Sequence, residues 1–313
     1  MRWLEIAPGF ACNCRCIGCH SCSDAAGDQM TSAEVMAWLQ RARRQGAQHL
    51  WLSGGEPTLR RDFLPTLRAA KALGYRRIKV QSNGMLFAYP EFAEKAVAAG
   101  MNEVNLLLKS LQPRVHDGLN RTPGSLELMH TGLERLRGLP VRLEGDVLVT
   151  TRNWPELPEL VRHYIQLGLK HFNLWLFSLV DQGDADLARL VPRVSDFLPA
   201  LLAAREEALA AGATLASLNT PACLLPPEAW DAVFDAVGMG LVVVNPGGKA
   251  FPLETSSIEQ GTYLPACATC ALRPRCGGMR SDYVAVHGDA EFQPVPTGLA
   301  DRLRGRGTNL DLP

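Results

Sequence analysis

Nine cysteines are unevenly distributed over this chain of 313 residues, and five of them lie in the short stretch from Cys12 to Cys22. Cys12, Cys16 and Cys19 follow the spacing C-x3-C-x2-C. Three thiolates on one loop can bind three corners of a [4Fe–4S] cluster and leave the fourth iron open to another ligand. The same spacing taken alone also fits a zinc site or part of a ferredoxin-type site. Cys14 and Cys22 fall outside it, and we expect a spectator thiol and a small packing residue, with a role as an alternate ligand as the other possibility.

A second segment whose residues could take part in binding or catalysis is LSGGEPTLR at 52–60, which follows a short apolar run. Gly54 and Gly55 permit a close approach between the backbone and a ligand, Glu56 offers a carboxylate, and Pro57 fixes the turn. An ordinary strand-to-helix turn would use the same residue types. Loops at the carboxyl ends of parallel strands are where α/β folds place their chemistry, so we expect this segment to adjoin the cysteine loop.

Four more cysteines occur in the last hundred residues. Cys267, Cys270 and Cys276 form C-x2-C-x5-C, and Cys223 lies in NTPACLLPP. Four cysteines in a region too short for a large core are typical of a bound metal that contributes to folding. Because C-x2-C is also half of a zinc site, structural zinc is the alternative.

Together, CNCRCIGC and GGEP resemble the signatures of the radical S-adenosylmethionine (SAM) enzymes. The resemblance implies that Cys12, Cys16 and Cys19 hold a [4Fe–4S] cluster whose open iron is chelated by SAM. The residues of G-G-E-P would hold the methionyl amino group of SAM. A reduced cluster would pass one electron to SAM and release a 5′-deoxyadenosyl radical, which would abstract hydrogen from a substrate. The aromatic residue that the family usually has before the third cysteine is replaced here by Gly18.

Polar residues also end the next two predicted strands. VQSNGM at 80–85 resembles the family's third-strand segment, which implies that Ser82 and Asn83 face the ribose or carboxylate of SAM. LLLKS ends the fourth strand, so we expect Lys109 or Ser110 to reach the SAM carboxylate.

The fifth predicted strand carries alternating charges. Arg142, Glu144 and Asp146 share one face, directed into a barrel mouth. We take Lys109 and Glu144 as the candidate catalytic residues. For each of them, a polar strand end near solvent would give the same pattern.

The C-terminal stretch resembles the SPASM and Twitch extensions of radical SAM enzymes, which carry auxiliary [4Fe–4S] clusters. The full SPASM pattern has a further cysteine where this chain has Leu253, so the cysteine count permits one auxiliary cluster. Its ligands would be Cys223, Cys267, Cys270 and Cys276. An alternative leaves three ligands and an iron open to substrate.

Short apolar runs alternate with amphipathic stretches from residue 3 to about 216. The predicted strands cover 3–7, 49–53, 77–82, 103–108, 141–149 and 171–177. The predicted helices run from a capping box at 31–34 to Gly46, then over about 62–74, 90–99, 125–137, 154–167 and 193–211. This alternation indicates a parallel sheet with right-handed crossovers. Periodicity fits an open sheet equally well, and the resemblance favours a partial (β/α)6 TIM-like barrel.

The pattern changes after residue 217, where GLVVVNPGGKAFPLE predicts an antiparallel hairpin that turns at Asn245–Gly248. We therefore expect a radical SAM core over 1–216 and a small iron–sulfur domain over 217–313.

Composition excludes several other classes of protein. Hydrophobic residues make up 47%, and the 32 basic residues balance the 32 acidic ones, so neither global disorder nor nucleic-acid binding is expected. No signal peptide or membrane span is evident, which favours a cytoplasmic protein. The resemblance to radical SAM enzymes implies a ribosomally made peptide or a small-molecule or cofactor precursor as substrate, and a flavodoxin- or ferredoxin-type electron donor. The rival functions are a non-catalytic iron–sulfur electron carrier and a zinc-stabilised binding protein.

Overall fold

The computed structural model describes residues 1–19, 29–179, 185–256 and 261–300. Its centre is a nine-stranded sheet in the order β7-β6-β5-β4-β3-β2-β1-β8-β9. The strands are β1 (Trp3–Ile6), β2 (His49–Leu52), β3 (Arg77–Ser82), β4 (Glu103–Leu108), β5 (Arg142–Val149), β6 (His171–Leu176), β7 (Thr214–Leu218), β8 (Leu241–Val244) and β9 (Ala250–Pro252). All neighbouring pairs are parallel except β8 with β9.

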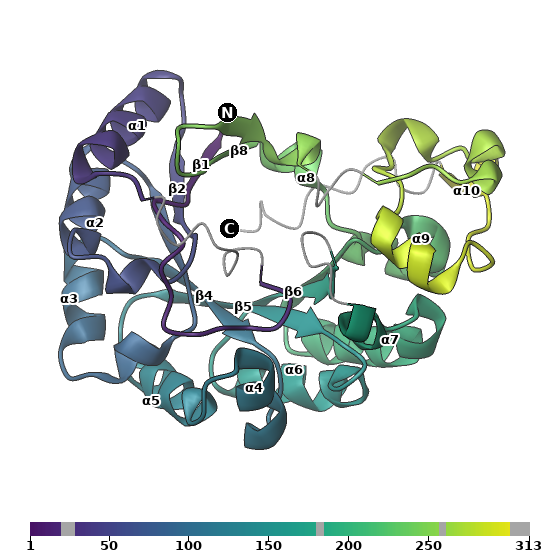
Figure 1. Ribbon diagram of the computed structural model, residues 1–313, viewed down its shortest axis with the longest axis horizontal. Helices are drawn as coiled ribbons and strands as arrows, with labels where there is room; N and C mark the ends of the chain where they lie inside the picture. Colours follow the sequence, from purple (N-terminus) through teal and green to yellow (C-terminus); the bar gives the residue numbers. More distant parts are fainter. Residues whose placement is uncertain (20–28, 180–184, 257–260, 301–313) are drawn as a thin grey trace.

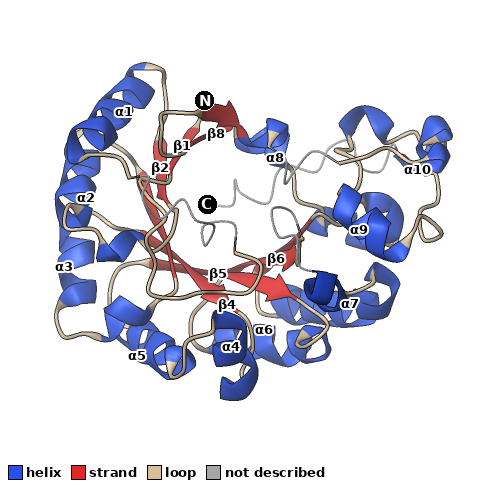
Figure 2. Ribbon diagram, in the orientation of Figure 1, coloured by secondary structure: helices blue, strands red, loops and turns tan. Residues whose placement is uncertain are grey.

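The sheet curves into an arc that does not close, with helices along its convex side (Figures 1 and 2). The helices are α1 (Ser32–Arg44), α2 (Phe63–Ala72), α3 (Phe92–Ala99), α4 (Pro113–Asn120), α5 (Ser125–Arg137), α6 (Leu157–Gln166), α7 (Val194–Ala210), α8 (Ala236–Met239), α9 (Ser281–His287) and α10 (Thr297–Ala300). The predicted α/β fold of the partial-barrel type is confirmed.

The two faces of the sheet differ in polarity because side chains alternate along each strand. Residues such as Leu4, Leu50 and Val104 are fully buried in the apolar core shared with the helices. The alternate residues, among them Lys79 and Glu144, form a polar layer on the concave face. The barrel interior therefore carries charged side chains beside a small apolar cluster that includes Trp3 and Trp51, and the main hydrophobic core lies between sheet and helices.

Local signals explain where the helices begin and end. The predicted capping box at the start of α1 is present, since Thr31 accepts from the backbone N–H of Glu34 and the Glu34 side chain accepts from that of Thr31. Gly46 follows the end of α1 with a φ of 93°, a conformation that glycine adopts without strain. Asp62 precedes α2, as expected.

Five of the described α-helices and strands were not predicted from the sequence, namely α4, β7, α8, α9 and α10, and the first two of them bear on the barrel. Helix α4 begins at Pro113, a residue favoured at the first helical position, but has no side-chain cap and only eight residues. Strand β7 pairs with β6 as a seventh parallel strand in sequence order. The expected boundary after residue 216 thus falls inside β7, and the division of the chain into two domains stays a prediction.

The predicted hairpin is confirmed, since β8 and β9 are antiparallel and Gly248 donates to the carbonyl of Asn245 at the turn. The hairpin belongs to the core sheet, because β8 pairs in parallel with β1 from Trp3 to Ile6. Chain beyond the expected boundary therefore extends the barrel at its first strand.

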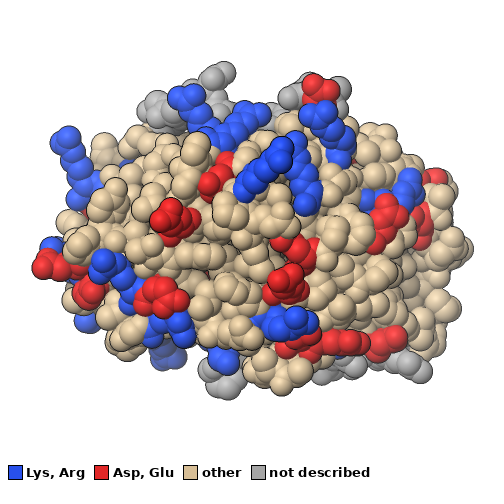
Figure 3. Space-filling model, turned by 90° about the horizontal axis from the view of Figure 1, so that it is seen from below, with Lys and Arg blue, Asp and Glu red and all other residues tan. Residues whose placement is uncertain are grey.

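In the part of the chain that is described, no helix is long and apolar enough to cross a membrane. On the face shown in Figure 3, basic and acidic side chains are interspersed, with wide uncharged areas between them.

Candidate active site

The cysteine loop leaves β1 and lies over the turn after β2. Backbone N–H groups of Gly55 and Glu56 donate to the carbonyls of Gly9 and Ala11, both at 2.9 Å. A Cβ added at Gly54 would lie 2.5 Å from the Gly9 oxygen, and one at Gly55 would lie 2.3 Å from the Ala11 oxygen. The two glycines were expected to admit a ligand. In the structure they admit the backbone of the cysteine loop.

The C-terminal end of α4 holds the loop from the other side. Arg15 and Ile17 donate backbone hydrogen bonds to the carbonyls of Asn120 and Leu119, at 3.2 and 2.8 Å. The Cys16 thiol donates to Asn120 Oδ1 at 3.2 Å, and Lys109 Nζ donates to the same oxygen. Sequence analysis missed Asn120 because its helix was missed.

The Glu56 carboxylate joins the ends of β2 and β3. It is 2% exposed and accepts from the Thr58 backbone and hydroxyl, from Ser82 Oγ at 2.9 Å and from the Asn83 backbone at 2.8 Å. Burial raises the pKa of Glu56, and these donors oppose the rise. Pro57 begins the short helical turn Pro57–Leu59 behind it. The structure thus brings together four of the predicted SAM-binding residues.

The spectator thiol of the sequence analysis has a defined environment. Cys14 is 2% exposed, and its Sγ lies 3.7 Å from Met85 Sδ and 3.7 Å from Asn83 Nδ2. Asn83 also donates to Asn13 Oδ1 at 2.7 Å. Cys14 therefore packs the loop against the end of β3. Cys22 lies outside the described residues.

The three predicted cluster ligands, Cys12, Cys16 and Cys19, are partly exposed on the loop. The eight described cysteines form no disulfide with one another. Among the described residues, no three Cys, His or carboxylate side chains converge as they would around a single metal ion. Thiolates around one zinc lie within about 4 Å of each other, whereas a cubane binds each thiolate at a different corner. Three thiols on one loop remain a donor set suited to a cluster.

The pKa of the Cys16 thiol is raised overall, although its neighbours act on it in opposite directions. Its neighbour Cys14 and burial raise its pKa, whereas the charge of Lys109 and a hydrogen bond from that ammonium lower it. Lys109 itself is only 4% exposed, and its carbonyl accepts from the Asn153 side chain. Ser110 is fully buried, and its hydroxyl accepts from the Gln112 backbone at the start of α4.

The ring of Phe177 lies against Gly18, the position before the third cysteine that has no aromatic side chain of its own. A Cβ at Gly18 would lie 2.3 Å from a ring carbon of Phe177, which directly follows β6 and is fully buried. Gly18 has a φ of 72°. The ring occupies the space that a side chain at position 18 would need.

Glu144 lies in an ion-pair network inside the barrel. Lys79 Nζ contacts Glu144 at 2.5 Å and Glu103 at 2.7 Å, and all three side chains are 1% exposed. Arg142 and Arg77 approach Glu144 at 3.1 and 3.6 Å. Burial would raise the pKa of Glu103, but Lys79 and Arg77 outweigh it and lower that pKa to about 2. The catalytic role of Glu144 stays a prediction.

Two more carboxyl groups line the barrel interior. Glu5 accepts from Ser53 Oγ at 2.6 Å, and burial raises its pKa to about 7. Asp146 accepts from Gln81 and Asn173, and burial raises its pKa as well. Only the alternation along β1 could have indicated Glu5 in advance.

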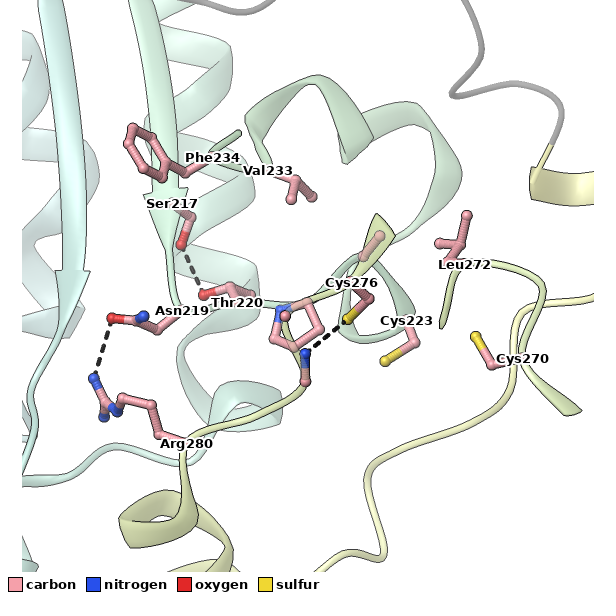
Figure 4. Close-up of a pocket in the computed structure, with 14 residues that line it drawn as sticks. Ser217, Asn219, Thr220, Cys223, Val233, Phe234, Cys270, Leu272, Cys276 and Arg280 are labelled. Atoms are coloured by element: carbon pink, nitrogen blue, oxygen red, sulfur yellow. Dashed lines mark hydrogen bonds between the residues drawn. The ribbon is translucent and has the colours of Figure 1, made fainter. Parts of the chain in front are cut away.

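The four C-terminal cysteines line one cavity. Cys223, Cys267, Cys270 and Cys276 line a small cavity of about 20 Å³, and three of them also border a neighbouring one of about 160 Å³. Figure 4 shows Cys223, Cys270 and Cys276 at one side of the larger cavity. Burial and the three other thiols raise the pKa of Cys223 to about 12. The four cysteines named from the sequence thus line one cavity, and their role as ligands of a cluster stays a prediction.

Arg280, which the sequence analysis did not single out, lies at the other side of the larger cavity. It is 3% exposed and donates to the carbonyls of Leu176 and Phe177. It also donates to Asn219 Oδ1 (Figure 4). This guanidinium joins the C-terminal segment to the ends of β6 and β7.

Comparison with known proteins places these features in one family. The sequence profile of the radical SAM superfamily matches residues 6–163. An AdoMet-dependent heme synthase from Methanosarcina barkeri is 28% identical over 58% of this chain and 51% of its own length. A probable GTP 3′,8-cyclase from Methanopyrus kandleri is 29% identical over 54% of this chain and 55% of its own length. The chain thus spans about half the length of these curated relatives.

Solved structures share the fold over most of the chain. SuiB from Streptococcus suis, solved bound to S-adenosylmethionine, superposes with a TM-score of 0.70 at 14% identity. The match covers 93% of this chain and 76% of that one. SuiB has also been solved bound to its precursor peptide SuiA.

Proposed function

Because this chain belongs to the radical SAM superfamily and is therefore an enzyme that uses a [4Fe–4S] cluster and SAM, we propose that Cys12, Cys16 and Cys19 hold that cluster. The observation that carries the proposal is the clamping of their loop between the Gly54–Glu56 turn and the end of α4. A loop fixed from two sides can present three thiolates in a set geometry before metal arrives.

When bound, the reduced cluster would supply one electron to SAM, and a C–S bond of SAM would break to give methionine and a 5′-deoxyadenosyl radical able to abstract hydrogen from the substrate. The chain itself binds and orients the reactants. Glu56, Ser82 and Asn83 form one hydrogen-bonded unit beside the loop, which suits them to fix the amino acid and ribose parts of SAM. Lys109 and Ser110 are proposed to act beside the cysteine loop, where Lys109 shares the Asn120 Oδ1 acceptor with Cys16. Glu144 pairs in register with Asn105, near the start of β4, so its proposed role is deeper in the barrel.

A second cluster is proposed at the four C-terminal cysteines, in a SPASM- or Twitch-like segment. The donor set fits, because Cys223, Cys267, Cys270 and Cys276 line one cavity. The other three thiols are close enough to raise the pKa of Cys223. Ligation by three of them, with one iron open to substrate, is the alternative within this proposal.

The proposed substrate is a ribosomally made peptide or a small-molecule cofactor precursor. The names of the curated relatives refer to heme and GTP, and SuiB binds a precursor peptide. A flavodoxin- or ferredoxin-type protein would supply the electron. The reducing cytoplasm, where thiols stay available for clusters, is the proposed location.

EPR spectroscopy of the anaerobically reconstituted, dithionite-reduced protein tests the assignment. We expect two cluster signals, one of which changes when SAM is added. That signal should vanish in a Cys12/Cys16/Cys19→Ala variant, and the other should vanish in a Cys267/Cys270/Cys276→Ala variant. The Cys223→Ser variant then distinguishes four auxiliary ligands from three.

The rival functions give different results in the same experiment. An electron carrier would bind iron without any response to SAM. A zinc-stabilised binding protein would stay colourless and contain zinc in place of iron. Either result would contradict the proposed enzyme.

A further inference from the structure

Lys109 is a buried cation at the end of β4, next to the loop of the proposed cluster. Its side chain is 4% exposed, and its ammonium donates to Asn120 Oδ1, the same oxygen that accepts from the Cys16 thiol at 3.2 Å. In the part of the chain that the structure describes, no carboxylate lies within ion-pair distance of it. A buried charge without a counter-charge is costly. Lys109 therefore needs an anion at this place.

The anion nearest at hand is a cysteine thiolate. A thiol loses its proton when it binds iron, so Cys16 would change from a donor into an acceptor. Asn120 Oδ1, which now accepts from the Cys16 thiol, would then face a second acceptor. The ammonium of Lys109 has three N–H groups and can donate to both atoms at once.

We propose that Lys109 is a positioning residue for the first cluster, and that with Asn120 it holds Cys16 and stabilises the reduced state of the cluster through its buried charge. This inference rests on the proposed function, because it requires a cluster at Cys12, Cys16 and Cys19. Reduction adds one negative charge to a cluster, and a cation in a low-dielectric surrounding favours the more negative state. Lys109 thus raises the reduction potential of the cluster.

The same helix end keeps this arrangement rigid. Asn120 Nδ2 donates to Ser125 Oγ, which donates in turn to Asp117 Oδ1. Asn120 cannot rotate its amide away without losing this partner. A fixed amide and a fixed ammonium are the outer contacts that orient a metal ligand.

The test is an EPR-monitored redox titration of the SAM-responsive signal in the reconstituted full-length chain, without SAM. In Lys109→Met we expect a more negative midpoint, with the equilibrium constant of reduction about tenfold lower, or about 59 mV for one electron. Lys109→Gln keeps a donor and loses only the charge, so it should shift the same way. Lys109→Arg keeps the charge and should restore most of the potential.

Arg121→Gln is the matched control. It removes a positive charge from the residue next to Asn120, but this side chain is exposed and its field is screened by water and salt. Its midpoint should equal that of the unaltered enzyme. A shift as large as that of Lys109→Met would mean that general surface charge sets the potential and would overturn the inference.

Two further results would count against Lys109 in this role. An unchanged midpoint in Lys109→Met would refute it. An effect seen only after SAM is added would assign Lys109 to the SAM carboxylate and equally refute it. In both cases the proposed function stands, provided that the signal is absent from the Cys12/Cys16/Cys19→Ala variant. A signal that persists in that variant would instead reject the proposed function.

Discussion

Gly55 lies beneath the carbonyl oxygen of Ala11, and a methyl group there would meet that oxygen at 2.3 Å. We predict that Gly55→Ala forces residues 9–11 off the turn and breaks the two backbone hydrogen bonds that hold the cysteine loop. Overpacking and lost hydrogen bonds should cost about 2–4 kcal/mol of unfolding free energy. Iron analysis after reconstitution should show a marked loss at the first site.

Gly118→Ala provides the control for this substitution. Gly118 lies within α4, and a Cβ there would meet nothing within 4 Å. Alanine inside a helix is favoured over glycine by roughly 0.5–1 kcal/mol, so stability should rise slightly and iron content stay unchanged. Normal iron content in Gly55→Ala would mean that the loop does not depend on this close contact.

Glu5 carries the second prediction for a single residue. Its pKa in the folded protein is raised to about 7 by burial. Between about pH 4.5 and 7 the unfolded chain releases the Glu5 proton while the folded chain keeps it, so stability falls as pH rises through this window. Glu5→Gln should therefore gain stability relative to the unaltered protein by up to roughly 3 kcal/mol across the window. Glutamine can still accept from Ser53.

Urea denaturation of the cluster-free protein under anaerobic reducing conditions, at several pH values, measures this difference. Glu94→Gln removes an exposed carboxyl group from α3 and serves as the control for net charge. A constant difference between Glu5→Gln and the unaltered protein from pH 4.5 to 7 would contradict the proposed protonation of Glu5.

Among the elements, those with strong local signals were predictable. The strands match the apolar runs to within a residue or two, and α1 begins at its capping box. Helix α4 gave no such signal, since its only cue was Pro113 and its stability comes from contacts with α5 and the cysteine loop. Its absence from the prediction hid Asn120, which is the residue that contacts Cys16.

The strands β3, β4 and β5 are joined inside the barrel by Lys79. Its ammonium bridges Glu103 and Glu144, and it lies 4.6 Å from the centre of the Trp51 ring. We predict that Lys79→Met destabilises the protein by about 3–5 kcal/mol, because it leaves two buried carboxylates without this cation. Urea denaturation gives the value.

The double variant Lys79→Met/Glu144→Gln separates charge from packing. Removing one of the two carboxylates should recover part of the lost stability if uncompensated charge is the cause. A double variant that is less stable than Lys79→Met alone would point to lost packing and to a separate role for Glu144.

For the whole molecule, sequence analysis reached the grouping of cysteines but not what joins the two halves of the chain. The spacing C-x2-C-x5-C is a local pattern, so Cys267, Cys270 and Cys276 could be recognised from the sequence. Arg280 has no such local pattern, and its partners Leu176 and Phe177 lie about a hundred residues earlier. Contacts of this kind depend on the finished fold. The boundary expected after residue 216 falls inside β7 because that strand was not predicted.

Arg280 leads to the last prediction. Its guanidinium donates to two main-chain carbonyls at the end of β6 and to Asn219, while the neighbouring Asp282 accepts from the Leu179 backbone at 2.7 Å. Arg280→Met would leave these carbonyls buried without a donor. We expect a loss of about 3–5 kcal/mol and faster proteolysis of the segment that carries Cys267, Cys270 and Cys276.

Arg273→Met is the matched control, because Arg273 belongs to the same segment but is exposed and lies over the Tyr263 ring. It should change stability by less than about 1 kcal/mol. Limited proteolysis with mass spectrometry identifies which segment is released first. If Arg280→Met resists the protease as well as Arg273→Met does, the C-terminal cysteines are held against the barrel by other contacts, and the cysteine-lined cavity itself becomes the next feature to alter.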